Sequence, residues 1–89
     1  MQLAYAPTFI RMLKALPQEL QIEALEKIEL FQNRKHHNML KVHKLKGRLA
    51  GRYSFSVNFR TRIVFQFANI RGERVAHLLA IGDHNVYLI

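Results

Sequence analysis

The side chains with the clearest chemical potential are concentrated in one basic stretch of the chain. Between Leu30 and Gly72 there are ten Lys and Arg residues and no Asp or Glu, and the 89-residue chain has a formal net charge of +8. The ten residues are Arg34, Lys35, Lys41, Lys44, Lys46, Arg48, Arg52, Arg60, Arg62 and Arg71. An acid-free basic surface attracts polyanions, and guanidinium and ammonium groups bind phosphate without reading base sequence. The stretch therefore predicts a nucleic-acid partner.

Other kinds of site are excluded or made improbable by composition. The chain has no Cys, which excludes disulfides, thiolate metal sites and a cysteine nucleophile. Carboxylates are scarce where the histidines cluster, so we expect no metal and no small-molecule cofactor. The apolar runs are far shorter than the roughly 20 residues that span a bilayer, and the N-terminus lacks a signal-peptide pattern. We expect a single domain, residues 1–89, in the cytoplasm, with no membrane partner.

The N-terminal third of the chain predicts a helical hairpin. Residues 2–5 tolerate a short strand, and Thr8 is placed to cap a first helix. Pro17 ends this helix and suits the first position of the next one. Apolar residues then recur every three or four positions, as one face of a second helix requires, at Leu20, Ala24, Leu25, Ile28 and Phe31. His36 and His37 are expected to finish that helix.

Two alternating segments further along predict a β-hairpin. In residues 53–59 apolar side chains alternate with polar ones, as in a strand with one buried face. Residues 63–67 form a second apolar strand, and residues 58–61 between them suit a turn. We expect the Phe side chains of this pattern to lie in the core. Residues 40–51 before the hairpin form a basic loop that contains two glycines.

The C-terminal part predicts a third strand of the same sheet. A turn is expected at residues 69–73, and residues 75–81 are apolar apart from His77. This run indicates a central strand covered on both faces, with His77 as a core residue. A break then precedes a short tail, residues 86–89. The fold class is therefore α+β: an N-terminal helical hairpin packed on one face of a small, mainly antiparallel β-sheet.

The second face of this sheet is expected to carry the chemistry. Ser54, Ser56 and Arg62 alternate with the apolar rows, so they project away from the helices. The basic loop borders the same face, with three cations at the edge of the sheet: Lys44, Lys46 and Arg48. This arrangement suits a groove that binds phosphates.

Four short motifs make the chain resemble the RelE/ParE superfamily of bacterial toxins over nearly its whole length. They are His43-Lys-Leu-Lys-Gly47, Gly51-Arg-Tyr-Ser-Phe-Ser-Val57, Arg62-Ile-Val-Phe65 and Ile81-Gly-Asp-His-Asn-Val-Tyr87. The ending is most similar to the YafQ-like and RelE/StbE-type mRNA interferases. The resemblance implies a RelE-like fold and the toxin of a type II toxin–antitoxin system. It also implies metal-independent cleavage of mRNA, with the cognate antitoxin, the mRNA and the ribosome as partners.

The resemblance also implies roles for particular residues in cleavage by the RNA's own 2′-OH. His84 matches the family's C-terminal histidine and would be the general acid, and histidines titrate near 6.5 when unperturbed. Arg62 matches the strand arginine that would hold the charge of the phosphorane, and His43 is the candidate general base. Tyr87 would stack on a base or orient the phosphate. RNA binding is further assigned to Lys44, Lys46, Arg48 and Arg60.

The residues leave alternatives open. YafQ-like toxins have a histidine and an aspartate in the region of Ser56 and Arg60, so the identity of the base is undecided. Arg62 could instead pair with an acid, His84 could be a turn residue, and Tyr87 could anchor the tail. A ParE-like gyrase poison and a non-catalytic RNA-binding module are the alternative functions.

Overall fold

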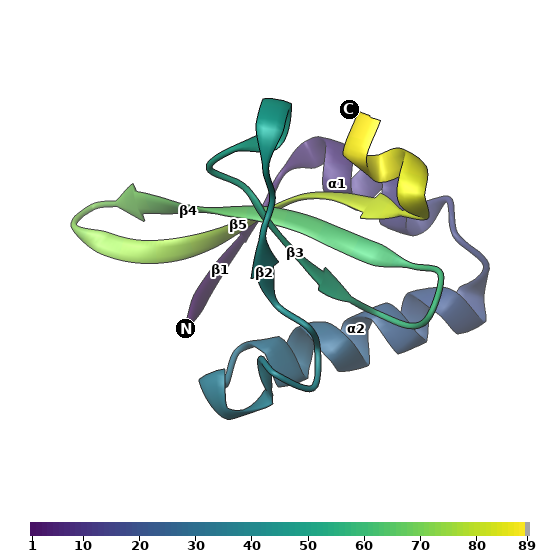
Figure 1. The fold of residues 1–89 in the computed structure, drawn as a ribbon. Coiled ribbons are helices and arrows are strands. Elements are labelled where there is room, and N and C mark those ends of the chain that lie inside the picture. The colour runs from purple at the N-terminus through teal and green to yellow at the C-terminus, as the bar shows by residue number, and fades with distance from the viewer. Residues whose placement is uncertain (89) are drawn as a thin grey trace.

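The computed structural model describes residues 1–88 and forms one mixed sheet with two helices (Figure 1). The helices are α1 (Pro7–Lys14) and α2 (Gln18–Phe31). The strands are β1 (Gln2–Tyr5), β2 (His43–Lys44), β3 (Tyr53–Ser56), β4 (Arg62–Ile70) and β5 (Glu73–Gly82). Three 3₁₀ helices complete the described residues: η1 (Arg34–His36), η2 (Gly47–Leu49) and η3 (His84–Leu88). Ile89, the end of the expected tail, lies outside them.

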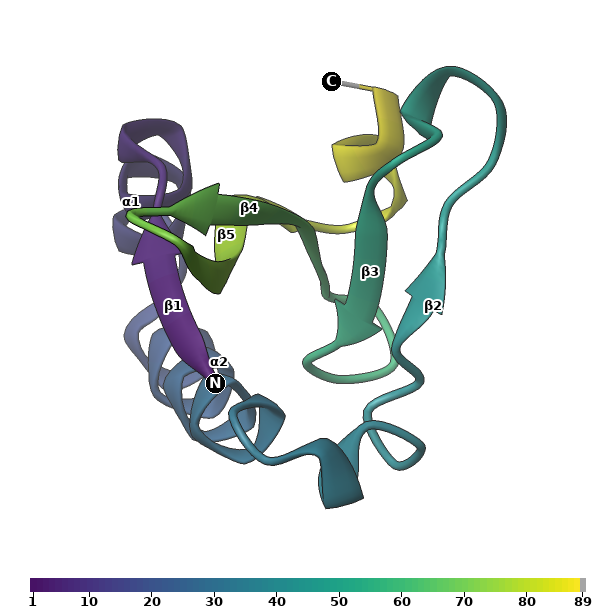
Figure 2. The same ribbon diagram turned by 90° about the vertical axis from the view of Figure 1, so that its left-hand side faces the viewer.

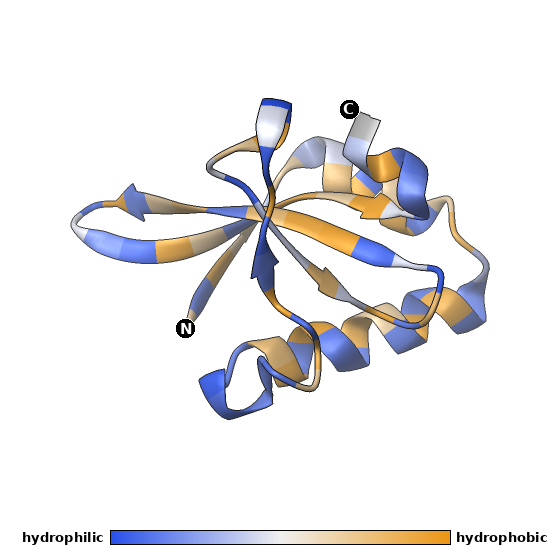
Figure 3. Cartoon of the chain, in the orientation of Figure 1, coloured by the Kyte–Doolittle hydropathy of each residue, from blue (hydrophilic) through white to orange (hydrophobic). Residues whose placement is uncertain are grey.

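The strand order is β1-β5-β4-β3-β2, with β1 parallel to β5 and every other pair antiparallel. This confirms the α+β class and the central position predicted for residues 75–81. The long β4–β5 hairpin closes through a two-residue turn in which both residues have positive φ, Arg71 at 52° and Gly72 at 80°. Such a turn matches the twist of the strands that it joins. Hydropathy follows this plan, because the hairpin is hydrophilic at this turn and largely hydrophobic near η3 (Figure 3).

Both helices contribute to one main core on a single face of the sheet. Phe31 of α2 is fully buried and stacks on Phe55 of β3, with ring centroids 4.4 Å apart, and meets Phe65 of β4 edge-on at 4.8 Å. The other members of this cluster are Phe9, Ala24, Ile28, Leu40, Val57, Ile63, Ala76, Leu78 and Ile81. Figure 1 shows α2 on one side of the sheet, with η2 and η3 on the other.

A smaller apolar cluster occupies the second face of the sheet. Val64 and Ala80 are buried there beneath Val86 of η3, and Met12 and Leu45 pack at the border. The sequence predicts a partly polar face here, bordered by the basic loop. The chain instead folds η3 back over the end of β4 and β5, because their alternating residues leave an apolar strip on this side that needs cover.

Several predicted boundaries are wrong. Thr8 is not the cap of α1, since Ala6 is the N-cap and Pro7, whose fixed φ suits a helix start, takes the first turn. Pro17 likewise lies one residue before α2 and is its N-cap. His36 and His37 do not finish α2. The helix ends at Phe31 because Asn33 is extended (φ −113°, ψ 121°) and its side chain accepts a hydrogen bond from the amide of Lys35.

The pattern in residues 53–59 overstates both the length of β3 and the burial of its aromatic residues. β3 ends at Ser56, because the chain turns back there and the amide of Val57 donates to the carbonyl of Thr61 at 2.9 Å. Phe59 consequently lies in the turn and is 92% exposed. Leu25, placed in the buried stripe of α2, is also exposed, and His77 is only half-buried. Within residues 1–88, neither helix is long and apolar enough to cross a bilayer.

Phe31→Ala should destabilise the protein strongly, because truncation leaves a cavity where three aromatic rings meet. We expect a loss of about 3–5 kcal/mol in the free energy of unfolding, measured by urea titration. Phe59→Ala is the matched control, since its ring contributes almost nothing to the core. Equal destabilisation by the two substitutions would contradict the core described above.

Candidate functional site

A hollow of about 330 Å³ lies where the β3–β4 turn approaches the start of η3. It is lined by Phe59, Arg60, Arg62, Asp83, His84 and Asn85. The antiparallel ladder brings these segments together, because Arg62 at the start of β4 pairs with Gly82 at the end of β5. Three residues assigned to the site from sequence, Arg60, Arg62 and His84, therefore line one hollow.

The guanidinium of Arg62 is held in place by the turn that precedes it. Its Nη1 donates to the carbonyl oxygen of Asn58 at 2.8 Å and to that of Thr61 at 3.4 Å, and the side chain is half-buried. Both contacts use a single nitrogen of a group that carries five N–H donors. The remaining donors can form the two-pronged contact that guanidinium groups make with phosphate. The alternative that Arg62 serves an acidic partner is not needed to explain its position.

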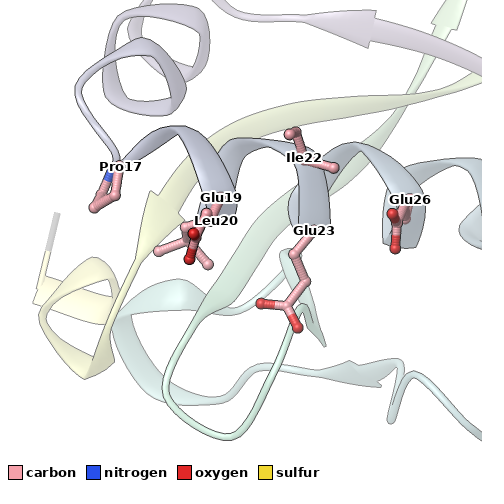
Figure 4. Close-up of a pocket in the computed structure, with 6 residues that line it drawn as sticks. All are labelled: Pro17, Glu19, Leu20, Ile22, Glu23 and Glu26. Atoms are coloured by element: carbon pink, nitrogen blue, oxygen red, sulfur yellow. The ribbon is translucent and has the colours of Figure 1, made fainter.

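Asn58 organises the turn that holds Arg62. Its Oδ1 accepts hydrogen bonds from the amides of Arg60 and Thr61, both at 2.9 Å, and its Nδ2 donates to Glu23 of α2 at 2.7 Å. Figure 4 shows the Glu23 side chain pointing from α2 toward this turn. The turn is thus fastened to the helix, and the backbone carbonyl that orients Arg62 is fastened with it.

Asn58→Ala should loosen this turn, because it removes three hydrogen bonds at once. We expect a loss of about 1–3 kcal/mol in the free energy of unfolding by urea titration. Asn69→Ala, at an exposed position beside the β4–β5 turn, is the control and should change stability little. A neutral Asn58→Ala would mean that the turn is held by its backbone alone.

His84 is the first residue of η3 and is exposed at the hollow. The carboxylate Oδ1 of Asp83 accepts a hydrogen bond from the amide of Asn85 at 2.9 Å, which shapes the turn that presents the imidazole. The ring of Tyr87 meets the His84 ring edge-on, with centroids 5.9 Å apart. Such contacts limit the directions in which the imidazole can point.

Tyr87 anchors η3 to the sheet. Its hydroxyl is 2.9 Å from the Oγ of Ser54 on β3, in a partly buried hydrogen bond, and its ring packs against the apolar cluster of the second face. This is the anchoring role that the sequence left open. A contact between Tyr87 and a base stays a prediction.

His43 is on the same face of the sheet but does not line the hollow. It pairs with Ser54 across β2 and β3, so both side chains project toward η3. Its Nδ1 donates to the carbonyl of Lys41 at 2.8 Å. In the neutral ring this contact would leave Nε2 as the acceptor, which is the nitrogen that a general base would use.

The assigned lysines and Arg48 are exposed on the β2–β3 segment. Lys44 pairs with Tyr53, whose ring stacks on Phe65 in the main core, so Lys44 lies on the helical face, opposite to His43. Lys46 and Arg48 belong to the connection that carries η2, which turns at Gly47 (φ +67°). Figure 2 shows this connection projecting above the sheet near η3.

Another hollow, of about 480 Å³, lies along α2 (Figure 4). Its ionisable lining residues are all carboxylates, Glu19, Glu23 and Glu26, which would repel phosphate. The hollow at His84 has one carboxylate beside two arginines, so we place the nucleic-acid site there. Among the described residues, no three His or carboxylate side chains cluster as metal ligands would, and we assign none.

Sequence reasoning missed three residues of the hollow: Phe59, Asp83 and Asn85. Asp83 and Asn85 flank His84, so the motif that singled out the histidine already contained them. Phe59 was assigned to the core by its period of two. The asparagine before it is typical of a turn and was the available signal that the strand had ended.

No protein-family model matches the chain, and no curated protein matches it. Solved structures do. A YoeB/ParE toxin from Agrobacterium tumefaciens is 23% identical, with 94% of this chain and 99% of that chain covered and a TM-score of 0.70. YafQ from E. coli strain BL21(DE3) is 11% identical, with 99% and 98% covered and a TM-score of 0.71.

The same likeness extends to a chain from the structure of a complex. A chain of the archaeal RelE–RelB complex from Pyrococcus horikoshii OT3 is 16% identical, with 92% of each chain covered and a TM-score of 0.66. Identities this low show a shared fold. The chain therefore has the fold of the RelE/ParE toxin superfamily, as its sequence motifs predict.

Proposed function

We propose that this chain is the toxin of a type II toxin–antitoxin pair and an endoribonuclease that cleaves mRNA on the ribosome without a metal. The observation that carries the proposal is the single hollow lined by His84, Arg62 and Arg60. At one concave site a proton donor and two guanidinium groups supply two needs of phosphodiester cleavage, protonation of the leaving oxygen and stabilisation of the extra negative charge. A poison that acts only by binding needs no such combination.

In the proposed reaction the 2′-oxygen of the RNA attacks the adjacent phosphorus. A bond forms between O2′ and phosphorus, and the bond from phosphorus to the departing 5′-oxygen breaks. A general base takes the proton of the 2′-OH, and His84 gives a proton to the 5′-oxygen. Arg62 stabilises the extra negative charge on the phosphorane, with its guanidinium already oriented by the turn.

His43 is the proposed base, in the tautomer that leaves Nε2 as the acceptor. It lies across the sheet face from the hollow, beside Ser54, so the RNA would have to place the attacked ribose between the two histidines. Lys46 and Arg48 extend the positive surface along that face and would bind the flanking phosphates. Lys44 would contact RNA only at the sheet edge.

The proposed partner is a cognate antitoxin. The solved neighbours include a toxin–antitoxin complex, RelBE2 from Mycobacterium tuberculosis, and the archaeal RelE–RelB complex. An acidic segment that orders on binding would neutralise the acid-free stretch and cover the hollow.

Primer extension on an mRNA in a reconstituted translation reaction tests the proposal. New stops in the coding region that appear only with both protein and ribosomes would support it, and their positions would give the codon preference. Stops on naked RNA would mean a ribosome-independent ribonuclease. Intact mRNA together with trapped, cleaved DNA in a gyrase assay would replace the proposal with a ParE-like function. Salt-dependent RNA binding without product would mean a binding module.

A further inference from the structure

Next to the hollow that holds His84 lies a hollow of similar size, about 330 Å³, which we call the second hollow. It is distinct from the acidic hollow along α2. The second hollow is formed by α2, by the segment before β2 and by the β3–β4 turn, and its lining includes Lys27, Met39, Lys41, Asn58, Phe59 and Arg62. Phe59 and Arg62 line both hollows. A chain bound at the first hollow can therefore continue into the second across these two side chains.

Phe59 is held out into solvent by an ordered turn. The ring is 92% exposed, while Asn58 beside it makes three hydrogen bonds, one of which reaches α2. Met39, on the other side of the hollow, is 59% exposed. The exposed ring of Phe59 contributes almost nothing to the free energy of folding, because it buries almost no apolar surface. It suits a contact with a flat apolar ligand.

Cations outnumber carboxylates at the second hollow, where Glu23, outside the lining, is hydrogen-bonded to Asn58 within it. Its ionisable lining residues are Lys27, Lys41 and Arg62, with no carboxylate among them. Lys41 has a left-handed backbone (φ 59°), which costs free energy for a residue with a side chain. This backbone conformation directs the Lys41 carbonyl toward Nδ1 of His43, the candidate base. Lys41 therefore contacts the candidate base through its backbone and also lines the second hollow.

We propose that this second hollow is a nucleotide subsite for single-stranded RNA, in which a base stacks on Phe59 and the adjoining phosphate meets Lys27 and Lys41. The proposal deepens the function proposed above and rests on it. An exposed aromatic ring bordered by cations is the combination by which proteins bind single strands. Continuity with the Arg62–His84 hollow, the proposed cleavage site, fits RNA, because one strand can place successive nucleotides at both sites.

Tryptophan fluorescence provides a direct test, because the chain has no Trp. Phe59→Trp introduces a single reporter, and adding His84→Ala to it should slow cleavage enough for the titration. The probes are a single-stranded RNA oligonucleotide and the same oligonucleotide with one abasic position at a time. We expect RNA to quench the indole at position 59, and one abasic position to remove the quenching. Ile70→Trp, at the exposed end of β4 next to the β4–β5 turn, is the matched control and should not respond.

Affinity provides the second measurement. In the His84→Ala background, Phe59→Ala should weaken RNA binding by about 5- to 150-fold, the range expected for the loss of one stacked base. Lys41→Ala and Lys27→Ala should weaken it and reduce the slope of log K against log salt by about 1 each. Urea unfolding of each variant checks that the fold is unchanged.

The outcomes separate this subsite from the proposed cleavage. Quenching of the indole at position 59 by RNA, together with no ribosome-dependent cleavage by the wild-type protein, would support the subsite and rule out the proposed endoribonuclease activity. Cleavage by the wild-type protein, with no quenching and unchanged affinity of Phe59→Ala, would overturn the subsite and leave the enzyme. If Phe59→Ala bound RNA as tightly as its parent but bound the antitoxin more weakly, the RNA subsite would be overturned and Phe59 would be a protein contact.

Discussion

Replacing His84 with alanine should lower the rate of RNA cleavage by about 10²–10⁴-fold, the usual contribution of a general acid. The imidazole is exposed at the hollow and packs only edge-on against Tyr87, so its removal leaves the core intact. The rate is measured by single-turnover cleavage of ribosome-bound mRNA. The free energy of unfolding and the affinity for the antitoxin should stay unchanged.

A modified substrate distinguishes proton donation from positioning. When sulfur replaces the departing 5′-oxygen, the thiolate leaves without protonation, so His84→Ala should cleave this substrate at close to the wild-type rate. His36→Ala is the matched control, because His36 belongs to η1 and does not line the hollow. Wild-type cleavage of normal RNA by His84→Ala, or an equal defect on the sulfur substrate, would remove His84 from the acid role.

Arg62→Ala should lower the cleavage rate by about 10²–10³-fold, as does loss of one group that stabilises transition-state charge. The reason is geometric as well as electrostatic, since Nη1 is fixed by the carbonyls of Asn58 and Thr61 while the other donors remain for phosphate. Arg62→Lys keeps the charge without the planar fork, so it should restore only part of the rate. The defect should appear in kcat more than in KM.

The structural contribution of Arg62 is measured separately. Loss of its contacts to the turn should also reduce stability, so both variants are compared by urea unfolding at the temperature of the kinetic assay. Arg34→Ala, an exposed arginine of η1, is the control for lost positive charge. If Arg34→Ala and Arg62→Ala lowered the cleavage rate equally, the effect would come from general electrostatic attraction of RNA. Arg62 would then have no specific role at the phosphorane.

The alternation in residues 53–59 shows how far a local pattern can predict a strand. The pattern placed Phe55 correctly in the core, but it could not indicate that β3 ends at Ser56. The end depends on a partner outside the segment, because the amide of Val57 bonds to the carbonyl of Thr61 and closes the turn. A period of two describes side-chain direction, whereas a strand exists only as far as its neighbour pairs with it.

The faces of β2 illustrate the same limit. His43 and Lys44 are adjacent, and the sequence placed both at one groove. The register pairs His43 with Ser54 and Lys44 with Tyr53, which separates them onto opposite faces of the sheet. A shift of one residue would exchange the two, and β2 is too short for its own pattern to specify the register.

The sequence by itself determined the α+β class, the two helices, the central strand and the charge that makes phosphate the expected ligand, because periodicity and composition are local properties of the chain. The motifs around Arg62 and His84 also located two residues that the fold brings to one hollow. Only the tertiary structure decided that Tyr87 bonds to Ser54, that His43 lies outside this hollow and that Phe59 is exposed beside it. Each of these depends on strand register and turn closure between distant segments, whose energies no local pattern contains.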